Sequence, residues 1–152
     1  MMRILTDTGA WIALTDTTDQ YHEKSTRLYR AIQKRNIPLT ITDYIFDETV
    51  TWLHYKIGHK TACEWGDKIL NSQMVDMIKI SDEHLHLAWT FFQKYHDQKF
   101  SLTDCTSFAV MKLSGITTTF SYDAHFSTMG FCVLGEEQML DSMISGRNAG
   151  KI

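Results

Sequence analysis

The sequence predicts an α/β domain in which helices cover both faces of a parallel sheet. Short β-branched, apolar segments alternate along the chain with longer segments whose apolar residues recur at helical spacing. This alternation is typical of βαβ units, whose crossovers are right-handed. The chain has 152 residues, which corresponds to one domain, and its 43% hydrophobic and 22% charged residues are ordinary for a globular protein with its own core.

Three strands and three helices are predicted in the first half of the chain. In order, they are a strand at 3–6, a helix at 21–34, a strand at 38–41, helices at 43–55 and 59–71, and a strand at 75–80. Pro38 opens its strand, a position that tolerates a residue without a backbone N–H. Thr42 or Asp43 can cap the helix that follows, and Gly58 ends it.

The second half continues the alternation with helices at 81–95 and 101–112 and strands at 116–120 and 131–134. Ser81 is a capping residue, and the acids that follow it suit the positive end of the helix dipole. Ser101 and Asp104 have the Ser-x-x-acid spacing of a capping box. The last 18 residues form a separate segment. It contains a short amphipathic stretch with Met139 and Leu140, and we expect 146–152 to be frayed. Packing of this segment on the domain or on a partner and a disordered tail both remain open.

The charge and cysteine content restrict the class of protein. Eighteen acids against 15 Lys and Arg residues give a net charge of −3. This balance argues against a protein that coats nucleic acid non-specifically, because such binding neutralises many phosphates. It does not exclude a nuclease with a short contact surface.

Cys63, Cys105 and Cys132 form no C-x-x-C pair, and no apolar run reaches the ~18 residues of a membrane span. Asp7 interrupts any N-terminal signal segment, so we expect a soluble cytoplasmic protein.

Four carboxylates lie at predicted element ends or among apolar helix residues. They are Asp7 after the first strand, Glu48 in the 43–55 helix, Asp104 in the first turn of its helix, and Asp123 after the fourth strand. In open parallel sheets, ligands bind beyond the carboxyl ends of strands, where the strand order reverses. Asp7 and Asp123 both occupy that edge, and they face each other if the first and fourth strands are neighbours.

Clustered carboxylates repel one another unless a cation is present, and oxygen-only ligands suit Mg²⁺ or Mn²⁺. Such ions support phosphodiester hydrolysis. Thr8 and Ser121 flank the acids and could hydrogen-bond a phosphate or a metal-bound water. Simpler interpretations also fit each acid. Asp104 could serve only the helix dipole, Asp123 could be a loop acid, and Glu48 could lie on an exposed face.

A row of basic residues lies on one face of the 21–34 helix. It consists of Lys24, Arg27, Arg30 and Lys34, with no acid between positions 24 and 35. Such a row is usually a solvated helix face, but the absence of acids also favours contact with RNA. Both interpretations remain open.

Four segments of the sequence resemble the PIN-domain family, and within it the VapC-like toxins. They are Ile4–Leu14 with its acid and hydroxyl residue, Thr42–Thr49, Phe100–Met111, and Thr118–Phe126 with Ser-Tyr-Asp. The resemblance implies a three-layer α/β/α sandwich with a five-stranded parallel sheet of order 3-2-1-4-5. It also implies a Mg²⁺- or Mn²⁺-dependent endoribonuclease in which Asp7, Glu48, Asp104 and Asp123 bind metal and Thr8 and Ser121 assist them. Glu48 is chosen over the nearby Asp43 and Asp47, since Asp47 points about 100° away from Glu48 on a helix.

The resemblance further implies a nuclease domain at 1–134 and a C-terminal tail at 135–152, to which it assigns no role. The partners it implies are an RNA substrate, a cognate antitoxin of a toxin–antitoxin pair, and a second copy in a homodimer, with no membrane. The alternative is a PIN-like module that binds RNA or protein without cutting.

Other sites fit the sequence less well. Asp7-Thr-Gly-Ala also occurs in aspartic proteases, but those need two such loops on an all-β scaffold. His84 and His86 are two residues apart and point to different helix faces, so they do not form a zinc pair. We interpret His125 as a satisfied loop residue. The four Trp residues at helical positions, Trp11, Trp52, Trp65 and Trp89, are expected to belong to the core.

Overall fold

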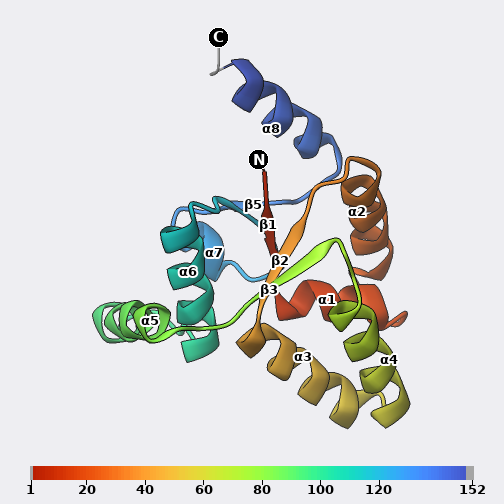
Figure 1. Cartoon of the computed structure of the whole chain (residues 1–152), viewed down its shortest axis with the longest axis horizontal. Helices are drawn as coiled ribbons and strands as arrows, with labels where there is room; N and C mark the ends of the chain where they lie inside the picture. Colours follow the sequence, from red (N-terminus) through yellow and green to blue (C-terminus); the bar gives the residue numbers. More distant parts are fainter. Residues whose placement is uncertain (1, 150–152) are drawn as a thin grey trace.

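The computed structural model describes residues 2–149, with side chains through residue 145, as a three-layer sandwich around a five-stranded parallel sheet (Figure 1). The strand order is β3-β2-β1-β4-β5. The strands are β1 (Ile4–Thr6), β2 (Leu39–Thr42), β3 (Val75–Ile78), β4 (Thr118–Phe120) and β5 (Cys132–Val133). Ile4 of β1 pairs with Leu39 on one side and with Thr118 on the other. The fold class and the strand order are therefore as predicted.

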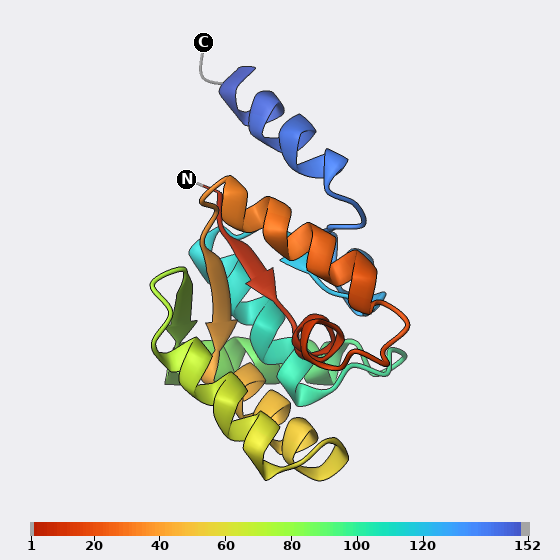
Figure 2. The same cartoon turned by 90° about the vertical axis from the view of Figure 1, so that its right-hand side faces the viewer.

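Helices form the two outer layers. One side of the sheet carries α1 (Thr8–Thr15), α2 (His22–Lys34), α3 (Asp43–Lys56) and α4 (His59–Leu70), and the other carries α5 (Asp82–Lys94), α6 (Leu102–Ser114) and α7 (His125–Thr128). Figure 2 shows α1, α2 and α4 in front of the strands, with α6 behind them. The three residues of β1 are all buried, as expected for a strand between two helical layers.

The predicted elements are present, with small shifts at their ends. Strand β3 ends at Ile78, two residues before the predicted end, because Ile80 instead donates its N–H to Asp43. The prediction that His125 lies in a loop was wrong. His125 begins the short helix α7, whose first turn lies directly after Asp123.

The C-terminal segment forms a helix, α8 (Gln138–Ala149), beyond α2 (Figure 2). Leu140 is completely buried, and Asp141 forms an ion pair of 2.9 Å with Arg35 at the end of α2. The helical backbone continues to Ala149, and a single internal glycine costs a helix only about 1 kcal/mol. Residues 150–152 of the predicted tail lie outside the described residues.

The core contains two of the four tryptophans. Trp11 and Trp65 are buried and meet edge-to-face, with ring centroids 5.8 Å apart. Trp52 is half-buried. Trp89 was wrongly assigned to the core, since it is 50% exposed on the outer face of α5 and stacks on Phe92. Within residues 2–149, no helix combines the length and the apolar character needed to cross a membrane.

Candidate active site

The carboxyl ends of the two central strands bring Asp7 and Asp123 to one place. Strands β1 and β4 are neighbours, and the N–H of Asp7 donates to the carbonyl of Phe120. The Ser121 hydroxyl donates to Oδ2 of Asp7 at 3.1 Å and accepts from the N–H of Asp123 at 3.0 Å. Ser121 therefore connects the two acids, and its hydroxyl position is set by both.

Asp104 reaches the same site from the first turn of α6. Its N–H donates to the Ser101 hydroxyl, and its Oδ2 accepts from the N–H of Ser101, so the predicted capping box is present. The same Oδ2 lies 3.1 Å from Nδ1 of His125, and that nitrogen is also 3.1 Å from Oδ1 of Asp123. One ligand atom each from Asp104, Asp123 and His125 lie within 4.8 Å of one another.

His125 is the site residue that the sequence interpretation missed. It is satisfied, as expected, but its partners are two of the four acids rather than loop atoms. The available signal was its position two residues after Asp123, which holds it in the same turn. The contact with Asp104 could not be anticipated, because 21 residues separate the two.

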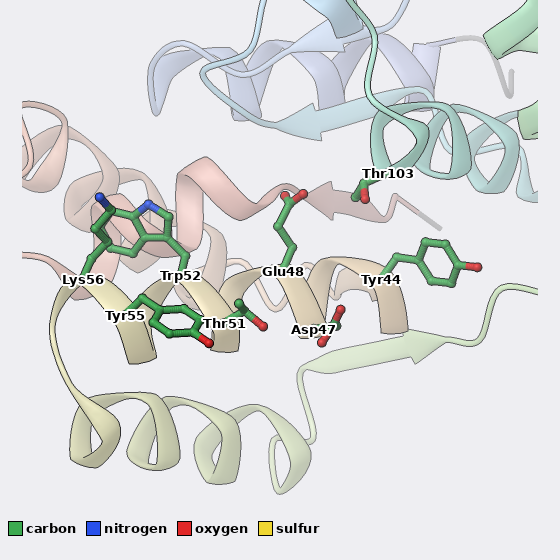
Figure 3. A pocket seen from close by; sticks show the side chains of 8 residues that line it. All are labelled: Tyr44, Asp47, Glu48, Thr51, Trp52, Tyr55, Lys56 and Thr103. Atoms are coloured by element: carbon green, nitrogen blue, oxygen red, sulfur yellow. The ribbon is translucent and has the colours of Figure 1, made fainter.

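Glu48 approaches the site from α3, which begins where the Thr42 hydroxyl accepts the N–H of Ile45. Figure 3 shows the Glu48 side chain extending toward the side of Thr103, next to Asp104, while Asp47 points the other way. Glu48 is exposed, and its charge acts on Asp7. Asp43 has a different role, because its Oδ1 accepts the N–H of Ile80 at 2.9 Å. The geometry thus favours Glu48 over its two neighbours.

Burial makes Asp7 the most perturbed acid of the site. The Asp7 side chain is nearly inaccessible, and this loss of solvent raises its pKa from 3.8 to about 7. The nearby charges of Asp104 and Glu48 raise this pKa further, while hydrogen bonds from the Thr8 N–H and the Ser121 hydroxyl lower it. An unshielded carboxylate is therefore costly here, and a cation would relieve the cost.

The donor atoms fit a hard divalent cation. Carboxylate oxygens dominate the site, and the buried Thr8 hydroxyl has no hydrogen-bond partner among the described residues. The hydroxyls of Thr6, Thr40, Ser107 and Thr118 are also buried without a partner in the described part of the chain, so the acids rather than Thr8 carry the case for a cation. The neighbouring thiol of Cys105 is not a nucleophile, because burial and the Asp104 charge raise its pKa to about 11.

The basic row on α2 divides into two parts. Nζ of Lys24 lies 6.0 Å from the ring centre of Tyr122, which neighbours Ser121 and Asp123 in the chain. The Tyr122 hydroxyl also hydrogen-bonds the Ser25 hydroxyl at 2.6 Å, so α2 is tied to the loop that carries the acids. Arg27, Arg30 and Lys34 extend away from this loop, beside Glu137 of the C-terminal segment.

A parallel α/β sandwich with carboxylates gathered at the carboxyl ends of its two central strands has the features of a PIN-like domain. The PIN-domain profile matches residues 4–131, and this chain belongs to the PIN-domain family.

Within the family, the similar proteins include VapC ribonucleases. The 23S rRNA-specific endonuclease VapC20 of Mycobacterium tuberculosis is 30% identical over 128 residues, covering 84% of this chain and 95% of the relative. A VapC ribonuclease of Archaeoglobus fulgidus is 30% identical over 131 residues, covering 83% of this chain and 80% of the relative. The crystal structure of VapC20, a sarcin–ricin loop cleaving toxin, superposes with a TM-score of 0.77 at 28% identity, covering 84% and 95%. The VapBC2 complex of Rickettsia felis shares the fold, with a TM-score of 0.68 at 9% identity, covering 88% and 98%.

Proposed function

We propose that this protein is an endoribonuclease that hydrolyses RNA phosphodiester bonds with bound Mg²⁺ or Mn²⁺. The observation that carries the proposal is the convergence of three acids from separate elements. Asp104 and Asp123 share His125, and Ser121 connects Asp123 to the buried Asp7. The similarity to proteins named as ribonucleases supports the choice of RNA as substrate. A bound divalent cation would supply charge neutralisation of the phosphate and a water of lowered pKa.

Each residue has a distinct role in this proposal. Asp7, Asp104 and Asp123 would hold the cation, with Glu48 reaching it or a second ion from α3. Ser121 orients Asp7 through its hydroxyl, and Thr8, which follows Asp7 in the chain, would assist it. His125 holds Asp104 and Asp123 at a common distance of 3.1 Å from its Nδ1. Lys24, Arg27, Arg30 and Lys34 would bind the RNA backbone, with Lys24 nearest to the acids.

The proposed biological role is that of a cytoplasmic toxin held by an antitoxin. Structural neighbours described as VapBC complexes support a protein partner of this kind. We also propose a homodimer, which is supported by three exposed apolar side chains on α5, namely Leu85, Trp89 and Phe92.

Cleavage of purified 23S rRNA by the purified protein tests the proposed reaction. We expect cleavage with Mg²⁺ or Mn²⁺, none with excess chelator, and a loss of at least 100-fold in Asp7→Asn. The Asp67→Asn variant, altered at an exposed acid on α4, is the matched control and should cut normally. Full cleavage by Asp7→Asn, verified free of contaminating nuclease, would overturn the mechanism. RNA binding without cleavage under all of these conditions would favour the alternative of a catalytically silent binding module.

A further inference from the structure

An open cavity of about 550 Å³ lies along α3 (Figure 3). Glu48 and Thr103 line the end next to Asp104, and Lys56 lines the other end. Between them lie the indole of Trp52 and the phenol of Tyr55, which is 79% exposed. The volume lies in the range of small-ligand pockets, which run from roughly 300 to 1,000 Å³.

The helix arranges these side chains in order. Glu48, Trp52 and Lys56 are spaced four residues apart, so they follow one another along the same face of α3, about 6 Å apart in rise. Figure 3 shows all three on the side of α3 toward which Thr103 lies. An acid, an aromatic face and an ammonium group therefore succeed one another with increasing distance from the proposed metal.

We propose that this cavity binds a base of the RNA substrate that flanks the scissile phosphate. The base stacks on Trp52 and Tyr55, and Lys56 contacts the phosphate beyond it. Aromatic side chains combined with a cation are the usual means of binding single-stranded RNA. The inference rests on the proposed endoribonuclease function, since it takes Glu48 as the end of the cavity nearest to the reaction.

An RNA base fits this cavity better than a second copy of the chain does. The centres of protein–protein interfaces are depleted of charged residues, whereas this cavity is lined by three of them, the carboxylates of Asp47 and Glu48 and the ammonium group of Lys56. Every base has a π-face that can use the two aromatic rings, and its exocyclic groups can reach the hydroxyls of Thr51 and Thr103. Those hydroxyls give the cavity a means of preferring one base.

Kinetics of Trp52 variants on a short RNA that the wild type cleaves test the stacking. We expect Trp52→Ala to raise KM about 5- to 150-fold, the range expected for the loss of one base–aromatic stack, with a smaller effect on kcat. Trp52→Phe should restore most of the affinity. Trp52→Leu should not, although leucine also fills apolar space. Equal KM values for Trp52→Phe and Trp52→Leu would overturn the stacking role.

Lys56→Ala should also raise KM. Its matched control is Lys60→Ala, which alters an exposed lysine on α4.

An abasic scan identifies the base itself. Single abasic nucleotides are placed at each position of the RNA, and binding is measured with Asp7→Asn protein so that no cleavage occurs. At one position next to the cleaved bond, the abasic change should weaken binding in the Asp7→Asn background and have no further effect when Trp52→Ala is added. If each abasic nucleotide weakens binding equally with and without Trp52→Ala, at every position of the RNA, the proposal is wrong.

Two further measurements separate the possible failures. If the protein neither binds nor cuts RNA, the proposed function itself fails. If it cuts RNA but Trp52→Ala leaves KM unchanged, only the base subsite fails. Sedimentation of Trp52→Ala tests the remaining occupant, because a change of oligomeric state without a change in KM would assign this cavity to a second copy of the chain.

Discussion

Asp7 combines three properties that rarely occur together in a carboxylate. It ends a fully buried strand, it is nearly inaccessible to solvent, and it lies within the electrostatic reach of Asp104 and Glu48. The burial and the two nearby charges disfavour the ionised form, and together they raise its pKa to about 7. A residue that is costly as a bare anion, yet is held in place by Ser121, is best explained by the binding of a cation.

The raised pKa of Asp7 predicts how the stability of the metal-free protein depends on pH. Between the unfolded pKa of 3.8 and the folded pKa of about 7, the folded state keeps a proton that the unfolded chain has lost, so the free energy of unfolding falls as pH rises. Above about pH 7 Asp7 is ionised in both states, and the free energy of unfolding falls no further on its account. Asp7→Asn removes this penalty and should therefore stabilise the protein in chelator by about 1–4 kcal/mol more at pH 8 than at pH 4.

Urea denaturation of both proteins in chelator at the two pH values checks this prediction. The Asp67→Asn variant should show no such difference, since Asp67 is exposed on α4. In chelator at pH 8, Asp7→Asn should be the more stable of the two proteins. Adding Mn²⁺ should stabilise only the protein that keeps Asp7, so that the wild type becomes the more stable. An effect of Asp7→Asn that is the same at pH 4 and pH 8 would contradict the pKa assignment.

At the scale of elements, the first turn of α6 serves folding and the site at once. Asp104 completes the capping box of its helix with one oxygen, and the same oxygen contacts His125. Helix α5 has the same capping geometry at Ser81, where the side chain of His84 takes the place of the acid. The two caps thus form a natural comparison, since only the cap of α6 supports an acid of the site.

The two caps predict different consequences for the same substitution. Ser101→Ala and Ser81→Ala should each lower the free energy of unfolding by about 0.5–2 kcal/mol, because each leaves a helix N–H without its side-chain acceptor. Only Ser101→Ala should also weaken Mn²⁺ binding, by roughly tenfold, because it loosens the turn that holds Asp104. Urea denaturation and calorimetric Mn²⁺ titration of both variants measure these effects. Equal Mn²⁺ affinities would show that the cap does not position the acid.

At the scale of the whole molecule, the net charge of −3 conceals a separation of charge. Acids gather at the sheet edge, and bases line α2, with Lys24 beside Tyr122. The C-terminal segment modifies this arrangement, because Glu136 and Glu137 line a surface hollow together with Lys24 and Arg27. Lys24 and Arg27 are therefore partly screened by acids of the protein itself, and Lys24 also lies next to the loop that carries Asp123.

This separation predicts the salt dependence of RNA binding. Replacing the four basic residues of α2 with glutamine should weaken binding and reduce the slope of log affinity against log salt by up to about 3, at roughly 0.7 per lost contact with single-stranded RNA. Lys24→Gln alone should have a larger effect than Lys34→Gln. Binding to Asp7→Asn protein is measured between low and moderate salt. The matched control replaces four exposed lysines elsewhere, namely Lys60, Lys79, Lys94 and Lys99. An unchanged slope would make the row a plain solvated face.

Much of the fold and part of the site could be predicted from the sequence, for local reasons. Periodicity, Pro38, Gly58 and the serine caps locate most helices and strands, because these signals act within one or two turns of chain. The positions of Asp7 and Asp123 at strand ends follow from the same local pattern. The strand order, in contrast, came from the resemblance to a family, since alternation alone does not decide which strands are neighbours.

Only the tertiary structure decided which side chains meet. The contact of His125 with Asp104, the approach of Glu48, and the exposure of Trp89 each depend on how helices far apart in the sequence pack on the sheet. The pKa of Asp7 has the same origin, because burial and nearby charges are properties of the packed molecule. Sequence by itself determined the kinds of residue available and the elements that carry them. Packing determined their distances, and with them the chemistry that the site can support.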